Sequence, residues 1–178
     1  MVKEIFVRNV LNRHKKRDDW FLDNYSLNPY QRCGFNCVYC YIHGSKYGER
    51  LSAELTVKIN APTILERELL RAKRSGRYGF IALSPATEPW MPIERNYQVT
   101  RKCLKVISRL RFPVHCLTKS TLILRDVDLL KEIDENAILP SDLRGKIGHG
   151  ALITVSISSL DENITKIFEP NAPKPRER

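Results

Sequence analysis

The stretch that decides the fold is residues 78–118, which read YGFIALSPATEPWMPIERNYQVTRKCLKVISRLRFPVHCLT. It opens with an apolar run of strand length at residues 78–83, and a second such run follows at residues 113–118. Between them, apolar residues recur at helical spacing over residues 96–111, namely Val99, Cys103, Val106, Ile107 and Leu110. Unbroken apolar strands on either side of an amphipathic helix predict parallel neighbours in a buried sheet.

The same alternation extends in both directions. A helix is predicted over residues 62–75, with Pro62 in its first turn and Gly76 after its end. The other predicted elements are extended segments at residues 3–8, 25–30 and 56–60, a helix at 126–136, a strand at 151–157 and a short helix at 161–168. The pattern predicts an α/β domain over residues 25–178, preceded by a basic N-terminal arm at residues 1–24.

Only about four strand–helix units are present, and four parallel strands cannot close into a barrel. Residues 169–178 are proline-rich and charged, and resemble the approach to a further helix. We therefore expect one of three arrangements: an open, partly wound sheet, a piece of a longer protein, or an oligomer in which the chains complete one another's barrel. Of these three, we favour the interpretation that the chain is a piece of a longer protein.

The chain has 178 residues, of which 42% are hydrophobic and 28% charged. At this length folding buries roughly 70% of the surface of the unfolded chain, so the core needs no disulfide or structural metal. No stretch approaches the ~20 apolar residues of a membrane span, and residues 1–17 carry charges where a signal peptide would be apolar. Because three of the five cysteines lie close together, metal binding in a reducing compartment is expected. We predict a cytoplasmic protein without membrane contacts.

The balance of 30 Lys and Arg against 20 Asp and Glu gives a net charge of +10. Such a field attracts nucleic acid, acidic proteins or anionic ligands without selecting one of them. Solvated helix faces are the simpler interpretation, since the predicted helices have an apolar stripe on their other side. Nucleic acid remains a candidate partner, and its binding would weaken steeply as salt rises.

The strongest chemical signal is the spacing of Cys33, Cys37 and Cys40, a C-x3-C-x2-C pattern that follows the first predicted strand of the domain. Three thiolates can hold three irons of a [4Fe-4S] cluster and leave the fourth iron open to a small molecule. Alternatively, His43 completes a Cys3His set for tetrahedral zinc in a structural site. The loop follows a strand of a parallel sheet, where α/β proteins place their chemistry, which favours the cluster. Cys103 and Cys116 are predicted to pack in the core.

Polar residues also lie at the carboxyl ends of the predicted strands. Ser84 and Lys119 follow apolar runs, and Ser156 lies within the last one. In a βα barrel this is the face on which sites are built. A solvated loop lysine and serines in helix caps or turns are the competing interpretations.

The segment Asn28-Pro29-Tyr30, the cysteine spacing and Tyr41 together resemble the signature of radical S-adenosylmethionine (SAM) enzymes, in the branch related to spore photoproduct lyase. Further blocks resemble that branch in order: Ala82-Leu83-Ser84, Thr87-Glu88-Pro89-Trp90, Pro92-Ile93-Glu94, Leu117-Thr118-Lys119-Ser120, Leu124-Arg125-Asp126 and Glu169-Pro170. The resemblance covers residues 25–178. It implies the N-terminal part of a partial (βα)6 TIM-like barrel whose C-terminal strands are missing from this chain.

The resemblance also implies a function. Cys33, Cys37 and Cys40 would hold the [4Fe-4S] cluster, whose open iron would take the amino and carboxylate groups of SAM. Reductive cleavage of SAM would yield a 5′-deoxyadenosyl radical that abstracts hydrogen from a substrate, with flavodoxin or ferredoxin as the electron donor. The SAM contacts implied by the resemblance are Tyr39 and Tyr41 beside the adenine, Lys119 at the carboxylate, and Ser84 and Ser156 at the amino acid or ribose.

One departure from the resemblance concerns the substrate. Spore photoproduct lyase carries a cysteine hydrogen donor at the position of Ala82, and alanine cannot return a hydrogen atom. The substrate is therefore left open, with nucleic acid as one variant. Two alternative functions involve no radical chemistry. One is a binding module whose fold is held together by zinc at the Cys3His set, and the other is a truncated scaffold that holds a cluster without cleaving SAM.

Overall fold

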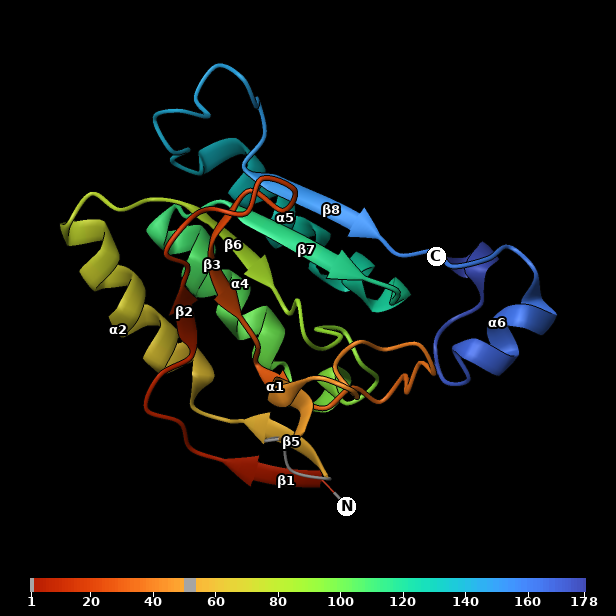
Figure 1. Cartoon of the computed structure of the whole chain (residues 1–178). Helices are drawn as coiled ribbons and strands as arrows, with labels where there is room; N and C mark the ends of the chain where they lie inside the picture. Colours follow the sequence, from red (N-terminus) through yellow and green to blue (C-terminus); the bar gives the residue numbers. More distant parts are fainter. Residues whose placement is uncertain (1, 50–53) are drawn as a thin grey trace.

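The computed structural model describes residues 2–49 and 54–178 (Figure 1). Within these residues the larger sheet has five strands in the order β2-β3-β6-β7-β8. The strands are β2 (Leu11–Arg13), β3 (Asp23–Leu27), β6 (Phe80–Leu83), β7 (Val114–Thr118) and β8 (Ala151–Val155). β3, β6, β7 and β8 are parallel, and β2 pairs antiparallel with β3 at one edge. The chain therefore folds as α/β around a mostly parallel sheet.

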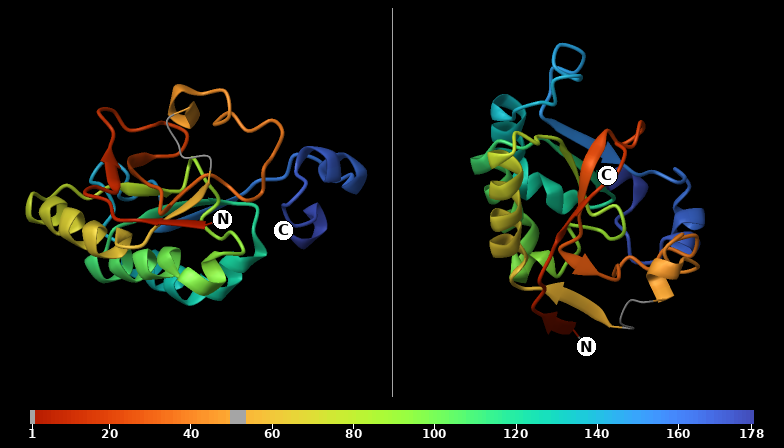
Figure 2. Two further views of the ribbon diagram at one scale, coloured as in Figure 1. Left: turned by 90° about the horizontal axis from the view of Figure 1, so that it is seen from below. Right: turned by 60° about the vertical axis from the view of Figure 1, so that its left-hand side comes forward.

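The helices that connect the parallel strands lie on one face of this sheet. They are α2 (Ala61–Arg74), α4 (Val99–Leu110) and α5 (Val127–Asn136), and Figure 2 shows them together on the same side of the strands. Their apolar stripes face the sheet, so that Leu65, Leu69 and Ile107 are fully buried with Leu27 and Leu83 of the strands. Helices on one face of a parallel sheet are expected when successive crossover connections have the same hand.

A smaller sheet lies beyond the carboxyl end of β3, where the backbone N–H of Lys58 donates to Pro29 O (3.1 Å). Within the described residues it comprises β1 (Val2–Ile5), β5 (Leu55–Lys58) and β4 (Tyr30–Gln31) in the order β1-β5-β4. The short helices are α1 (Lys46–Glu49), α3 (Glu94–Tyr97) and α6 (Glu162–Phe168), with 3-10 turns η1 (Thr121–Asp126) and η2 (Pro175–Glu177). No helix in the described ranges is long and apolar enough to cross a membrane.

Most predicted elements are confirmed, with ends shifted by a few residues. The predicted helix over 62–75 is α2, and the predicted strands at 113–118 and 151–157 are β7 and β8. Cys103 and Cys116 are fully buried, as expected for packing residues. The stretch predicted as an N-terminal arm contributes β1, β2 and the first residues of β3, so residues 2–24 are built into both sheets. The boundary between residues 24 and 25 and the (βα)6 barrel remain predictions.

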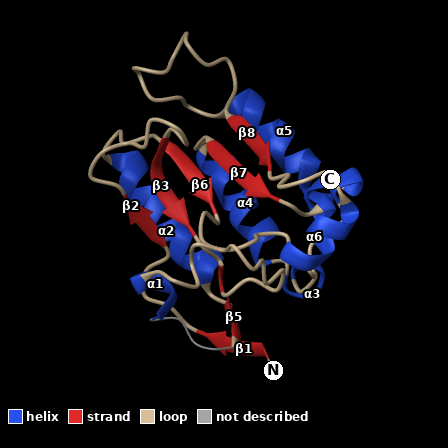
Figure 3. Ribbon diagram, turned by 45° about the vertical axis from the view of Figure 1, so that its right-hand side comes forward, coloured by secondary structure: helices blue, strands red, loops and turns tan. Residues whose placement is uncertain are grey.

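The carboxyl ends of the parallel strands meet at one end of the sheet. In Figure 3 the arrowheads of β3, β6, β7 and β8 point toward the loops and α6 at that end. The C-terminal segment folds back there onto the cysteine loop, where the backbone N–H of Val38 donates to Phe168 O (2.9 Å) and Asn171 Nδ2 donates to Gly34 O (3.1 Å). Residues far apart in the sequence are thereby brought together around one space.

A buried polar network supports the loop after β6. Asp126 accepts hydrogen bonds from Trp90 Nε1 (2.8 Å) and Arg101 Nη1 (2.7 Å), and Arg125 bridges Asp126 and Glu94. Both carboxylate side chains are fully buried. The network ties the loop to α4 and η1, and so fixes the backbone that carries part of the site.

Candidate functional site

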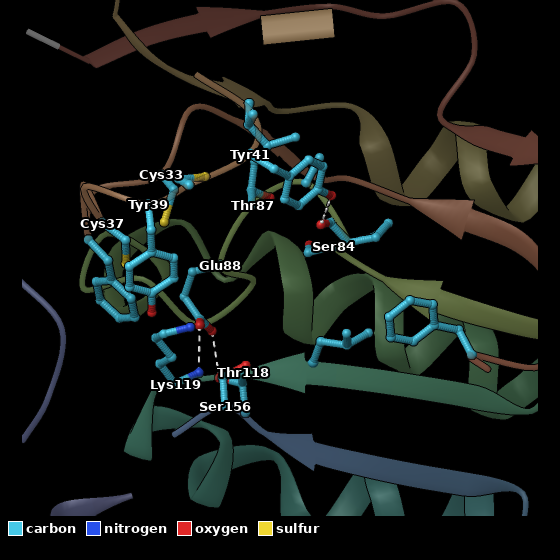
Figure 4. A pocket seen from close by; sticks show the side chains of 17 residues that line it. Cys33, Cys37, Tyr39, Tyr41, Ser84, Thr87, Glu88, Thr118, Lys119 and Ser156 are labelled. Carbon is cyan, nitrogen blue, oxygen red and sulfur yellow. Dashed lines mark hydrogen bonds between the residues drawn. The ribbon is translucent and has the colours of Figure 1, made fainter. Parts of the chain in front are cut away.

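A pocket of about 360 Å³ opens at the carboxyl ends of the strands. Its lining includes every residue that the sequence singled out for cluster or SAM binding: Cys33, Cys37, Cys40, Tyr39, Tyr41, Ser84, Lys119 and Ser156. Figure 4 shows most of these side chains around the common space, with those of the cysteine loop on one side and the strand ends of β7 and β8 on the other. The structure thus brings together residues from widely separated segments of the chain.

The cysteine loop is a succession of tight turns. The backbone N–H of Asn36 donates to Cys33 O (3.4 Å), and the N–H of Cys40 donates to Cys37 O (3.1 Å). Asn36 has a φ of 49°, a left-handed conformation that asparagine tolerates better than most residues. These turns let one short loop present all three cysteines to the same pocket.

Burial favours the protonated form of two of the thiols. Burial raises the pKa of the Cys33 thiol to about 11. Burial also raises the pKa of Cys37, and the nearby Lys119 ammonium acts in the opposite direction. Metal binding at these cysteines would therefore release protons, because only the thiolate is a strong ligand.

The three cysteines match the number of ligands that a [4Fe-4S] cluster with one open iron requires, whereas a structural zinc site requires a fourth ligand. Ligands about 2.3 Å from one tetrahedral zinc lie about 3.8 Å from each other. Among the described residues, no three His, Cys, Asp or Glu side chains form such a group. His43 is exposed and does not line the pocket. Three cysteines spread around a pocket suit a cluster, in which each thiolate binds a different iron.

The two tyrosines differ in their contacts. Tyr39 OH donates to the buried carboxylate of Glu169, and Lys119 Nζ lies 5.8 Å from the centre of the Tyr39 ring. Burial, reinforced by this hydrogen bond, raises the pKa of Tyr39. Tyr41 OH donates to Pro85 O (2.7 Å), which holds its ring over the loop after β6. Both rings are about half or more exposed at the pocket mouth.

Ser84 is the most strained of the predicted residues. It follows β6 with a φ of 57°, and its backbone N–H donates to Leu27 O (2.7 Å). Its side chain is buried, and no group in the described part of the chain lies within hydrogen-bond distance of its hydroxyl. The Thr87 hydroxyl, which also lines the pocket, is in the same condition. A buried hydroxyl without a partner costs about 1–3 kcal/mol, so both groups are suited to receive a polar ligand.

Two acidic residues at the site had no role assigned from the sequence. Glu88 lines the pocket and accepts hydrogen bonds from Thr118 Oγ1 (2.6 Å) and from the backbone N–H of Lys119 (2.8 Å). Burial raises the pKa of Glu88, and these hydrogen bonds offset part of that effect. In Figure 4 its carboxylate points toward the end of β7. Glu88 thereby fixes the backbone on which Lys119 stands.

Glu169 is the second of these acids, and its carboxylate contacts three side chains at the pocket. Its carboxylate accepts from Tyr39 OH and from Arg178 Nη2 (2.5 Å), and lies 3.8 Å from Lys119 Nζ. Arg178 Nη1 also donates to Ser156 O (3.0 Å). Both acids lie in blocks that resemble the radical SAM branch, and that was the only sequence signal for them.

No protein-family model matches the chain, and no solved structure matches it. The chain is similar to an uncharacterised protein of Methanocaldococcus jannaschii, with 28% identity over 86% of this chain and 52% of that protein. An uncharacterised protein of Mycobacterium tuberculosis is 26% identical over 86% of this chain and 43% of its own length. The chain therefore spans about half the length of these relatives.

Another similar protein is named after an enzymatic activity. It is the radical SAM Nalpha-GlyT isomerase of Pseudomonas phage M6, which is 27% identical over 99 residues. The match covers 56% of this chain and 20% of the phage protein. The comparisons thus give a distant and partial similarity to a radical SAM enzyme.

Proposed function

We propose that this chain is the cofactor-binding part of a radical SAM enzyme, in which Cys33, Cys37 and Cys40 hold a [4Fe-4S] cluster and the adjoining pocket binds SAM. The observation that supports this proposal is the convergence of all the predicted residues on one pocket at the carboxyl ends of parallel strands. The partial similarity to the phage radical SAM isomerase points in the same direction.

When bound, the cluster supplies the electron that cleaves SAM reductively and so starts radical chemistry. The residues of the chain bind and orient SAM. Lys119 places a cation where a carboxylate is to be neutralised, and the free hydroxyls of Ser84 and Thr87 offer hydrogen bonds to the amino acid or ribose. Tyr39 and Tyr41 supply aromatic faces for the adenine and limit the access of water.

The first test is which cysteines the cluster needs. After anaerobic reconstitution with iron and sulfide, we expect the wild-type chain to bind four irons per chain. Cys33→Ala, Cys37→Ala and Cys40→Ala should each lose most of this iron and the brown absorption. Cys103→Ala and Cys116→Ala are matched controls, because both thiols are buried away from the pocket, and they should retain it.

Two results would overturn the proposal. One is equal iron content in all five variants, which would mean that the iron is bound elsewhere. The other is tight binding of one zinc ion in place of a cluster, lost in His43→Ala, which would establish the zinc-stapled module.

A further inference from the structure

A second group of polar residues lies on the face of the large sheet opposite α2, α4 and α5. In the register of the parallel strands, Ser26 pairs with Ala82, and Ala82 pairs with His115. Residues paired in this way point to the same face of a sheet. The register shifts between Asp23 and Tyr25, so that Asp23 pairs with Phe80 and joins this face as well. The face that the helices leave free is therefore unusually polar.

A recess of about 500 Å³ opens on this face. Its lining includes His14, Asp18, Asp23 and Ser26. Phe21 and Pro85 line both this recess and the cysteine pocket, so the two spaces adjoin. A molecule held in the recess would lie next to SAM in the pocket.

Three polar side chains are linked to one another at the centre of the recess. His14 Nδ1 lies 3.3 Å from Asp23 Oδ2, and His14 Nε2 lies 3.2 Å from Ser26 Oγ. Asp23 is only 3% exposed, and none of the described residues offers a hydrogen bond to its Oδ1. A buried carboxylate oxygen without a donor is costly unless a ligand supplies one.

The charges around the recess indicate what kind of ligand fits. Lys16 Nζ lies 3.7 Å from Asp19, and Arg17 pairs with Asp142, so both basic residues of the lining have acidic partners. Asp18 also lines the recess, and its carboxylate accepts hydrogen bonds from the backbone N–H groups of Trp20 and Phe21. The Phe21 ring adds an aromatic surface, which attracts organic cations.

We propose that this recess is the substrate subsite of the enzyme and that it takes a cationic nitrogen group, an amine or amidine, whose N–H donates to Asp23 Oδ1. The assignment as a substrate subsite rests on the proposed function. His14, which is itself hydrogen-bonded to Ser26, holds the Asp23 carboxylate in place, and Phe21 lines both the recess and the SAM pocket.

The test uses benzamidine as the probe and benzamide, its neutral isostere, as the control ligand, added to the full chain without iron or SAM. Nuclear magnetic resonance follows the ring protons of the four histidines. Benzamidine should shift the His14 signals saturably, with a smaller effect on His115, which contacts Phe21. The His43 and His149 signals should stay unchanged, because neither residue lines the recess. Benzamide should cause no saturable shift at His14.

Matched variants then locate the binding. Asp23→Asn should weaken benzamidine binding at least about tenfold, because it removes a charged acceptor. Glu135→Gln removes the same charge from an exposed side chain of α5 that does not line the recess, and should change affinity by less than about twofold. If Asp23→Asn does not fold, the comparison of benzamidine with benzamide on the wild-type chain decides the question alone.

The outcomes separate this inference from the proposed function. The recess assignment is overturned if benzamidine leaves His14 unmoved, or if benzamide binds equally well, even when the reconstituted chain cleaves SAM. If benzamidine binds as described but the reconstituted chain neither assembles a cluster nor cleaves SAM, the cation site stands and its role as a substrate subsite falls.

Discussion

Ser84 combines a left-handed backbone with a buried hydroxyl that lacks a partner among the described residues. Each feature destabilises the folded chain, and both lie in the wall of the same pocket. Strain of this kind persists where the surrounding structure enforces it, and it concentrates at functional sites. Substitutions at Ser84 therefore distinguish its effect on the stability of the fold from its effect on ligand affinity.

Ser84→Gly is expected to raise the free energy of unfolding by about 1 kcal/mol, because glycine relieves the left-handed strain and removes the orphan hydroxyl. The same change should weaken SAM binding to the reconstituted chain. Ser84→Ala keeps the left-handed strain but also removes the orphan hydroxyl, so it should lose affinity with a smaller gain in stability than Ser84→Gly. Denaturant titration and equilibrium dialysis measure the two effects, and a stable Ser84→Gly chain with unchanged SAM affinity would contradict the assignment.

Lys119 supplies the second prediction at this scale. Lys119→Met preserves the length of the side chain but removes the cation from the pocket, so SAM affinity should fall about tenfold or more. Iron content should not change, since the ammonium holds no iron. Lys105→Met, on an exposed position of α4, is the control. Equal SAM affinity in the two variants would remove Lys119 from the site.

The chemistry-bearing residues were predictable where their spacing or position in the chain is distinctive. Three cysteines within one loop, and a lysine directly after an apolar strand, can be recognised without a structure. Glu88, Glu169 and Asp23 could not be assigned roles in this way, because their burial depends on contacts with distant segments. For Asp23 the deciding feature is a register shift in β3, which leaves no mark in the sequence.

At the scale of elements, the long helices were predictable from their periodicity, but the short strands and 3-10 turns between them were not. β2 is three residues long and partly exposed, and η1 follows a 3-10 period that a helical template misses. The buried network around Asp126 joins η1 to α4 and to the loop after β6. We expect this network to set the stability of the site's scaffold.

Asp126→Asn should lower the free energy of unfolding by about 3 kcal/mol at neutral pH, because it removes the buried charge that Arg125 and Arg101 share and leaves them only Glu94 and Asp128 as acidic partners. Asp19→Asn, an exposed acid, should have little effect. Chemical denaturation of the two variants measures the difference. A loss below about 1 kcal/mol would mean that the network contributes little.

The same carboxylate predicts a pH dependence. Burial acts to raise the pKa of Asp126, but hydrogen bonds from Arg125, Arg101 and Trp90 outweigh it and lower the pKa below the ordinary 3.8. Its contribution is therefore complete above that value and is lost as the pH falls through the lower folded-state pKa. The stability difference between wild type and Asp126→Asn should shrink as the pH is lowered below 3.8. A constant difference across this range would contradict the lowered pKa.

At the scale of the whole molecule, β8 forms an open edge of the large sheet. In the described part of the chain it pairs only with β7, and Ile153 and Val155 on it are 49% and 41% exposed. An apolar edge strand is a template for pairing with another strand.

This edge predicts self-association of the 178-residue chain. The apparent mass in light scattering should rise with concentration, and Val155→Lys should suppress that rise because a charge on an edge strand blocks pairing. Ile164→Lys, a similarly exposed position on α6, should leave the association unchanged. A wild-type chain that stays monomeric at all concentrations would show that the edge is protected.

The central claim, that the pocket holds a [4Fe-4S] cluster and SAM for radical chemistry, is tested most directly on the anaerobically reconstituted chain. The cluster is reduced, its electron paramagnetic resonance spectrum is recorded with and without SAM, and 5′-deoxyadenosine is assayed in the same samples. We predict a spectrum that changes when SAM is added, together with formation of the nucleoside. A cluster whose spectrum is indifferent to SAM, with no nucleoside formed, would contradict the account and leave a scaffold that carries a cluster without radical SAM activity.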